Sequence, residues 1–287
     1  MKVETFESYR PLLFSIAYRM LGTASDAEDI LQDAYLRVMD RPEEQIENPK
    51  TYLATVVTRL CLNELSTARS KRETYVGPWL PEPIPTEEIP VLDNPSDSAV
   101  QYDSISVAFL VLLESLSPAE RAVFLLHEVF GYKHQEIAQI LGKTEAACRQ
   151  LLRRARAHVT ENKPRFTATP EDHERLLNSF IEVVEDGEVD AFLDALAEDV
   201  TFVPDGGGTR GAAIRVLKGK DAVSSFILGT SRFSPPGLKY SVKSLNGQQA
   251  ILARTPEGQP YFAIFIYGDG QRVQMIHLIA GEKLKSI

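Results

Sequence analysis

Cysteines, long apolar runs and a secretory leader are scarce or missing in this chain. Cys61 and Cys148 are the only two cysteines among 287 residues, so a disulfide framework or a cysteine-rich metal site is excluded by number. The longest apolar run, VAFLVLL from Val107, is too short to span a bilayer. The first ten residues lack the apolar core of a signal peptide. We therefore expect a soluble protein that stays in the cytoplasm.

Histidine is sparse as well, and this limits the chemistry that the chain can support. The five histidines are scattered without the spacing of metal ligands, so we predict no metal and no cofactor. Hydrophobic residues, in contrast, make up 44% of the chain. That share is enough for a buried core in each of the two or three domains that this length predicts.

Positive charge is scarce overall, since the formal net charge is -9, but it is concentrated in one stretch. Residues 133–163 hold seven basic and three acidic side chains. Within them, GKTEAACRQLLRRARAHV places Cys148, Leu152 and Ala155 on one helical face and its arginines on another. A locally cationic face can bind phosphates whatever the net charge of the protein. The alternative is that the arginines only keep an exposed helix face in solvent.

The residues around this basic stretch predict a helix-turn-helix. SPAE forms a capping box with Ser117 as N-cap and Glu120 at N3, and the helix that it starts should end at Gly131. A short helix at HQEIAQIL, a turn at Gly142 and a cap at Thr144 follow. The second helix of such a motif enters the major groove of DNA. Base edges are assigned to Glu145, Arg149 and Gln150, and further DNA contacts to Lys143, Thr144, Arg153, Arg154 and Arg156.

The segments on either side of this motif differ in character. Residues 6–72 read as helical, with a capping box predicted at Ser25 and Glu28 and a new helix from Pro49. Residues 77–98 hold six prolines among acidic side chains and read as a linker.

The C-terminal part reads as an α+β unit. It begins with a helix to about Glu185 and a second helix at VDAFLDAL. Five strand-like segments follow between turn residues, and they predict an antiparallel sheet wrapped on helices: DVTFVPD, KYSVKSLNG, QAILARTPEG, PYFAIFIYGDG and QRVQMIHLIAG.

Several of these stretches resemble the extracytoplasmic-function (ECF) class of bacterial RNA polymerase sigma factors. SDAEDILQDAYLRVM is similar to the polymerase-binding segment of domain 2, NPKTYLATVVTRLCLNEL to the promoter-melting segment, and LSPAERAVFLLHEVFGYKHQEIAQILGKTEAACRQLLRRARA to domain 4. WLPEP from Trp79 and DGGG from Asp205 resemble the subgroup with a C-terminal SnoaL-like (NTF2-like) domain. NGQQA from Asn246 and AGEKL from Ala280 look like altered forms of that subgroup's NGQPG and NPDKL stretches.

The resemblance implies a multidomain fold class: two all-α sigma domains followed by an α+β SnoaL-like cone domain. The expected boundaries are sigma domain 2 at 1–75, a proline-rich acidic linker at 76–104, sigma domain 4 at 105–163 and the SnoaL-like domain at 170–287.

The resemblance also implies three further sets of site residues. The RNA polymerase-binding set is Asp29, Gln32, Asp33 and Arg37. The minus-10 set, in which an aromatic face and short polar groups suit unstacked bases, is Tyr52, Val56, Arg59, Asn63, Arg69, Lys71 and Arg72. The interdomain regulatory set is Trp79, Leu80, Pro81, Glu82, Pro83, Asp205, Gly206, Gly207 and Gly208.

The function implied by the resemblance is that of a sigma factor, not an enzyme. It would bind core RNA polymerase and promoter DNA, recognise minus-10 and minus-35 elements, and be regulated in cis by its third domain. Two alternatives are a ligand-responsive helix-turn-helix regulator and a SnoaL-type enzyme fused to a DNA-binding tether. In the latter, Asp205 and His277 would be the acid and base, in a pocket that takes an unknown small molecule.

Trp79 is a large apolar side chain in the predicted linker. In a freely solvated linker such a side chain would stay exposed to water and add no stability. We predict that Trp79 anchors the linker to a neighbouring domain. The alternative is that it is buried against domain 2 without a regulatory role.

Overall fold

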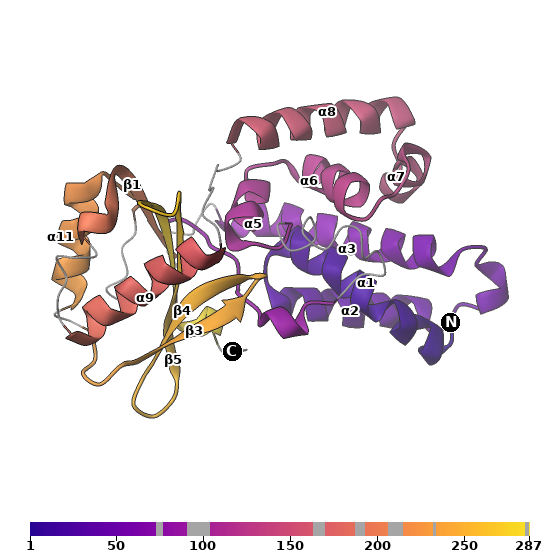
Figure 1. Ribbon diagram of the computed structural model, residues 1–287. Helices are drawn as coiled ribbons and strands as arrows, with labels where there is room; N and C mark the ends of the chain where they lie inside the picture. Colours follow the sequence, from indigo (N-terminus) through magenta and orange to yellow (C-terminus); the bar gives the residue numbers. More distant parts are fainter. Residues whose placement is uncertain are drawn as a thin grey trace. The chain divides into compact units, whose positions relative to one another are not determined.

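The computed structural model describes residues 1–72, 77–90, 104–162, 170–186, 193–205, 215–231, 234–284 and 287. The chain divides into two compact units (Figure 1). One unit contains Met1–Thr74 and Glu87–Lys163, and the other contains Tyr75–Thr86 and Pro164–Ile287. The first eleven residues of the expected linker, 76–86, therefore belong to the unit of the C-terminal domain.

Domain 2 is built from three helices that bury one face each. They are α1 (Val3–Leu21), α2 (Ala24–Val38) and α3 (Pro49–Arg72), with the 3-10 turn η1 (Glu43–Gln45) before α3. Their shared core contains Leu13, Ile16, Ala27, Leu31, Ala34, Leu53, Ala54 and Val57. The spacing of these residues matches the helical period, so burial of the apolar face explains why the segment folds as a bundle.

The start of α2 differs from the capping box that the sequence predicts. Thr23, in an extended conformation, is the N-cap, and Ser25 lies inside the first turn, so the assignment of Ser25 and Glu28 to a capping box is wrong. Gly22 ends α1 with a φ of 79°, and its N–H bonds to the Tyr18 carbonyl at 2.7 Å. Because this left-handed cap ends α1 at Gly22, Thr23 is the one residue between the cap and the first turn of α2. The helix therefore begins at Ala24, before Ser25 can act as its N-cap.

Domain 4 contains the predicted helix-turn-helix. Its elements are α5 (Val107–Glu114), α6 (Pro118–Phe124), the π-helical turn η4 (Leu125–Val129), α7 (His134–Leu141) and α8 (Glu145–Asn162). The capping box of Ser117 and Glu120 is confirmed. Gly142 ends α7 with a φ of 63°, and Thr144 caps α8 by accepting from the Ala147 N–H at 3.2 Å. The π-helical turn is a feature that the sequence patterns did not predict.

The C-terminal domain is a six-stranded sheet with helices packed on it. Its elements are α9 (Pro170–Asp186), β1 (Leu196–Pro204), β2 (Leu217–Lys218), α11 (Lys220–Ser231), β3 (Lys239–Leu245), β4 (Gln248–Arg254), β5 (Pro260–Gly268), β6 (Val273–Ala280) and the 3-10 turn η5 (Gly281–Leu284). The strand order is β2-β1-β6-β5-β4-β3. The predicted antiparallel pairing is wrong for β1 and β6, which run parallel.

The parallel pair has a topological cause. The chain passes through β2 and α11 after β1, neither of which the sequence predicted, and β1 then pairs with the last strand of the sheet. The predicted helix VDAFLDAL is helical only at residues 193–195 in its described part, since β1 begins at Leu196 and residues 189–192 lie outside the described residues.

Helix α9 lies across the sheet in Figure 1, and its apolar side chains form a core with the strands. Members of this core include Leu176, Leu177, Phe180, Phe202, Val223, Ile251, Ile264, Ile266 and Ile276. Helices on a curved sheet are the α+β layout that the resemblance to SnoaL-like domains implied.

Candidate DNA-binding, polymerase-binding and linker-binding surfaces

Helix α8 presents its predicted DNA-binding residues opposite a buried stripe. The stripe is made of Cys148, Leu152, Ala155 and Val159. The exposed predicted residues are Lys143, Thr144, Arg149, Gln150, Arg153, Arg154 and Arg156, and Glu145 is partly exposed. An α-helix with this division can enter the major groove with its cationic face forward.

Two arginines of α8 are held by carboxylates at the surface. Arg149 Nη1 lies 3.1 Å from Glu145 Oε2, one turn earlier in the same helix, and Arg154 Nε lies 2.9 Å from Glu120 Oε1 of α6. The arginine side chains are 58% and 60% exposed. Exposed ion pairs contribute little to stability, so a phosphate or a base edge can replace the carboxylate.

A third arginine of α8 is held by the π-helical turn. Arg156 donates to Glu128 Oε1 from Nη2 at 2.6 Å and from Nε at 3.0 Å, and His127 Nδ1 lies 2.9 Å from the same oxygen. The His127 and His134 ring centroids are 4.6 Å apart. Burial lowers the pKa of His134, with further contributions from His127 and the arginines, so this ring adds no charge near neutral pH.

The predicted polymerase-binding residues share one exposed face of α2. Asp29, Gln32, Asp33 and Arg37 are all exposed and recur at helical spacing. Leu36 lies on the same side and is 55% exposed, an unusual position for a leucine.

Met39, directly after α2, is 43% exposed. Neither Leu36 nor Met39 was among the predicted site residues. The available signal was that Leu36 falls outside the buried stripe of α2, which contains Ala27, Ile30, Leu31, Ala34 and Val38.

The predicted minus-10 residues follow one stripe of α3. Tyr52, Val56, Arg59 and Asn63 recur at the i, i+4, i+7 and i+11 positions of the helix. Tyr52 is half-buried, and the guanidinium of Arg41 lies 5.4 Å from its ring centroid.

Arg59 is partly committed to protein contacts, because Nε donates to the Ile140 carbonyl at 2.9 Å. Three further members of the minus-10 set, Arg69, Lys71 and Arg72, belong to the last turns of α3, and their side chains lie outside the described residues.

The WLPEP segment is bound by the C-terminal domain through a shared lysine and aspartate. Lys283 Nζ lies 2.8 Å from Asp205 Oδ1 and donates to the Leu80 carbonyl at 2.6 Å. The Leu80 N–H donates to the same Asp205 oxygen at 3.2 Å. Lys283 also lies 5.0 Å from the ring centroid of Trp79, a cation–π distance.

Burial makes this contact more than a surface ion pair. Leu80 is fully buried and Asp205 is 3% exposed. Pro81 and Pro83 are buried and Glu82 is half-buried, whereas Gly206, Gly207 and Gly208 lie outside the described residues. A buried carboxylate requires partners for its charge, and the linker backbone and Lys283 supply them.

A second contact runs along the edge strand β3. The Ile84 N–H donates to Asn246 Oδ1 at 2.9 Å, and the Asn246 N–H donates to the Ile84 carbonyl at 3.0 Å. Pro85 pairs with Leu245 as an isolated antiparallel bridge. Thr86 Oγ1 accepts from the Ser244 hydroxyl at 2.8 Å. The linker therefore forms a one-residue β-bridge at the open edge of the sheet.

His277 of β6 is buried and packs its ring 5.2 Å from that of Tyr267. Burial lowers its pKa to about 3, so it remains neutral and is a weak base at neutral pH. Its Nδ1 has no hydrogen-bond partner among the described residues.

Comparison with known proteins decides the family. Models of two protein families match the chain: sigma-70 region 2 over residues 5–71 and sigma-70 region 4 over residues 106–159. The ECF RNA polymerase sigma factor SigJ of Mycobacterium tuberculosis is 41% identical over 241 residues, which cover 83% of this chain and 76% of SigJ. The chain belongs to the ECF sigma factors. It directs promoter-specific transcription initiation, and sigma factors do so by binding core RNA polymerase and promoter DNA.

Two further comparisons agree with this family. The probable ECF sigma factor SigI of M. tuberculosis is 32% identical to this sigma factor over 250 residues, or 86% of this chain and 82% of SigI. The crystal structure of M. tuberculosis SigJ matches over 100% of both chains, with 33% identity and a TM-score of 0.75. No helix within the described part of this sigma factor is both long and apolar enough to cross a membrane.

Two residues of the linker contact in this sigma factor were not among the predicted site residues. Asn246 opens NGQQA and Lys283 lies in AGEKL, the two stretches that depart from the subgroup's usual forms. Their resemblance to the subgroup was the available signal. The contacts to Ile84 and Leu80 give each a partner that sequence spacing cannot reveal, because those partners lie far away along the chain.

Proposed function

We propose that the C-terminal domain regulates initiation in cis by holding the linker between domains 2 and 4. The observation that carries the proposal is that two linker N–H groups donate to buried side-chain oxygens of this domain. Leu80 donates to Asp205 at 3.2 Å and Ile84 to Asn246 at 2.9 Å. Buried hydrogen bonds of this kind fix a segment because breaking them leaves unsatisfied polar groups.

Holding the linker matters because the two promoter elements lie far apart. Their names place them about 25 base pairs from each other, which is about 85 Å along the DNA at 3.4 Å per base pair. Domains 2 and 4 reach both elements only if the linker between them permits it. Linker docking therefore sets the fraction of molecules that are competent for initiation.

The exposed helix faces are assigned to the other steps of initiation. The α2 face, extended by Leu36 and Met39, binds core polymerase through an apolar patch with a polar rim. The α3 stripe holds the minus-10 strand, and the α8 face reads the minus-35 element. A ligand-responsive helix-turn-helix regulator does not need a sigma-70 region 2 or a polymerase-binding face on α2, so the match to region 2 favours the sigma factor over this alternative.

The C-terminal domain acts as a binding module and not as an enzyme. Asp205, one of the two acid and base candidates, already accepts hydrogen bonds from Leu80 and Lys283. The other, His277, is buried with its pKa lowered to about 3, which makes it a poor base. A small molecule bound by this domain would act by changing linker docking. The site of action is the cytoplasm, where core polymerase and the chromosome meet.

Transcription from a matched promoter with purified core polymerase tests this proposal. The variants are Asn246→Ala combined with Lys283→Met, and a chain from which residues 170–287 are removed. Both should change transcript yield several-fold in the same direction, while affinity for a short duplex carrying only the minus-35 element stays constant. Lys243→Met, which removes an exposed lysine from β3, is the matched control. Equal yields from all four proteins would contradict regulation by the C-terminal domain.

A further inference from the structure

Arg156 of α8 is held more firmly than Arg149 and Arg154 of the same helix. Its Nε and Nη2 both donate to Glu128 Oε1, at 3.0 Å and 2.6 Å. Arg149 and Arg154 each have one nitrogen beside a carboxylate, at 3.1 Å and 2.9 Å. Two donors fix the plane of a guanidinium, whereas a single contact leaves the group free to rotate. Of these three arginines, Arg156 is the one whose direction is set before DNA binds.

Glu128 is itself fixed by the π-helical turn η4. The turn buries Leu125 and Leu126 and leaves Glu128 at the surface, next to α8. His127 Nδ1 of the same turn lies 2.9 Å from Glu128 Oε1, the oxygen that Arg156 binds. Single π-helical turns are rare and occur frequently at functional sites. This turn presents a carboxylate of fixed position to the recognition helix.

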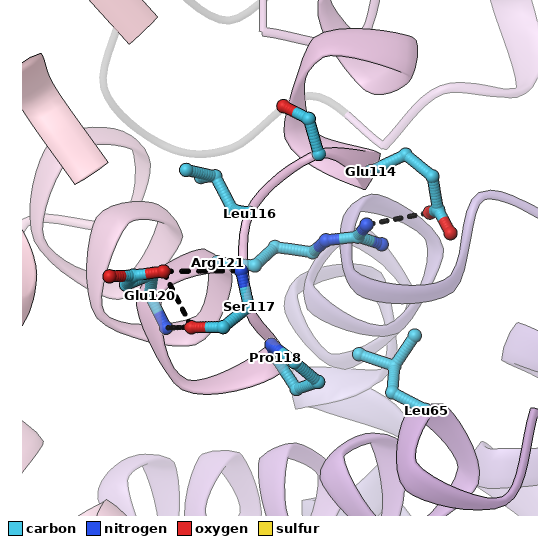
Figure 2. Close-up of a pocket in the computed structure, with 8 residues that line it drawn as sticks. Leu65, Glu114, Leu116, Ser117, Pro118, Glu120 and Arg121 are labelled. Atoms are coloured by element: carbon cyan, nitrogen blue, oxygen red, sulfur yellow. Dashed lines mark hydrogen bonds and ion pairs between the residues drawn. The ribbon is translucent and has the colours of Figure 1, made fainter. Parts of the chain in front are cut away.

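Glu120 of α6 is a second carboxylate beside α8, but its presence has a local explanation. Its Oε2 accepts from the Ser117 N–H at 3.2 Å and from the Ser117 hydroxyl at 2.6 Å, at the edge of a cavity of about 380 Å³ (Figure 2). Glu120 therefore completes a capping box. Among the described residues, Glu128 bonds only to His127 and Arg156. No capping role accounts for Glu128, so its contact with Arg156 needs another reason.

The position of Arg156 on α8 suits a phosphate contact. Arg156 shares an exposed face with Arg149 and Arg153 and lies seven residues after Arg149. Seven residues of α-helix rise about 10 Å, and the major groove is about 12 Å wide. With Arg149 at the base edges, Arg156 reaches the edge of the groove, where the phosphates lie. Arg156 Nη1 makes no hydrogen bond within the described part of the chain, so this nitrogen can bind a phosphate while Glu128 keeps the other two.

We propose that Glu128 is a positioning residue for promoter binding, which aims Arg156 at a DNA phosphate beside the minus-35 element. Glu128 acts through Arg156 and makes no DNA contact of its own. An arginine side chain loses rotamer freedom when it binds, and a partner that orders it in advance reduces that loss. This inference rests on the proposed assignment of the α8 face to the minus-35 element.

Charge alone predicts the opposite effect of Glu128. A carboxylate close to DNA repels the phosphates, so its removal should strengthen binding to every sequence. Positioning predicts instead that Glu128→Ala weakens binding about threefold, because the DNA must then order the Arg156 side chain itself. The sign of the effect therefore separates the two roles.

Fluorescence anisotropy of the full chain with a short duplex that carries the minus-35 element measures these effects. Arg156→Ala should weaken binding about tenfold and lower the salt slope by about one, because one phosphate contact is lost. Glu128→Ala should weaken binding about threefold and keep the salt slope, because Arg156 still neutralises the phosphate. Glu128→Ala added to Arg156→Ala should weaken binding no further, as expected for two residues that act as one unit.

Two further variants complete the test. Glu161→Ala is the matched control, because Glu161 is exposed in the last turn of α8 and the substitution removes the same charge. It should bind the duplex at least as tightly as the wild type. Glu128→Gln keeps an oxygen acceptor for Arg156, so its affinity should lie between those of the wild type and Glu128→Ala.

The results distinguish a failure of this inference from a failure of the proposed function. Wild-type affinity of Arg156→Ala would contradict the assignment of the α8 face, and the inference with it. A weakened Arg156→Ala together with a Glu128→Ala that binds as tightly as the wild type, or more tightly, would overturn the positioning role alone. So would a loss from Glu128→Ala that persists in full when Arg156 is already replaced, because Glu128 would then act through another part of the domain.

Discussion

Ile84 and Asn246 exchange two hydrogen bonds: the Ile84 N–H donates to Asn246 Oδ1 at 2.9 Å, and the Asn246 N–H donates to the Ile84 carbonyl at 3.0 Å. Asn246 has a φ of 52° and Gly247 a φ of 73°, as a two-residue turn between antiparallel strands requires. Asparagine tolerates this left-handed conformation better than most residues. One side chain therefore serves both the β3–β4 turn and the linker.

Replacing Asn246 should release the linker. Asn246→Ala removes the side-chain acceptor of the Ile84 N–H, which should weaken docking by about 1–3 kcal/mol. It also places alanine at a positive φ, which should destabilise the β3–β4 turn. Amide exchange measured by mass spectrometry on peptides that contain Ile84 should become at least tenfold faster. Asn246→Gly separates the two causes, because it keeps the turn and loses only the amide. Unchanged exchange in both variants would show that the docking does not depend on Asn246.

The exposed leucine of α2 provides a test of the polymerase-binding face. Leu36 is 55% exposed, so Leu36→Ala should leave the melting temperature nearly unchanged, since alanine also favours the helix. If core polymerase buries Leu36, the substitution should weaken binding about five- to twentyfold. Fluorescence anisotropy with labelled protein and core polymerase measures this. Leu228→Ala in α11, where a leucine is 39% exposed, is the control that should bind normally. Equal affinities for all three proteins would remove Leu36 from the interface.

Local signals in the sequence predicted the helix-turn-helix well. The capping box at Ser117 and Glu120, the left-handed turn at Gly142 and the cap at Thr144 all involve residues close together in the chain. Such short-range hydrogen bonds depend on residue type and spacing, which a sequence displays directly. The wrong capping box at Ser25 shows the limit of this approach, because the preceding turn at Gly22 decided where α2 begins.

Long-range pairings were much less accessible. The parallel pair of β1 and β6 joins strands from opposite ends of the domain, and no local pattern distinguishes it from an antiparallel pair. Lys283 reaches Leu80 across most of the chain. The contact of Arg59 with α7 is of the same kind, since an arginine in a DNA-binding stripe gives no sign that it also binds a helix end.

Two arginines of α8 should behave differently on DNA. Arg149 lies near the start of α8 and pairs with Glu145, so Arg149→Ala should weaken minus-35 binding by about 1–3 kcal/mol and change the preferred base. Arg154 pairs with Glu120 beside the helix, so Arg154→Ala should weaken binding to every sequence and lower the salt slope by about one. Binding to a promoter library at several salt concentrations measures both. Equal losses that do not depend on sequence would mean that α8 meets the groove with another face.

The stability of the C-terminal domain should fall in mild acid because of His277. Its pKa is lowered from 6.5 to about 3 by burial, so the unfolded chain takes up a proton in this range while the folded domain does not. The stability that neutral His277 allows is therefore fully present above pH 6.5 and is lost progressively as the pH falls towards 3.

Between pH 7.5 and pH 5, the free energy of unfolding should drop by about 2 kcal/mol from this residue alone. Urea unfolding followed by the fluorescence of Trp79, the one tryptophan of the chain and a neighbour of Lys283 in this domain, measures the drop. His277→Phe should be less sensitive to acid than the wild type by about that amount, even if it is less stable overall. The same pH dependence in both proteins would show that His277 is accessible to protons in the folded domain.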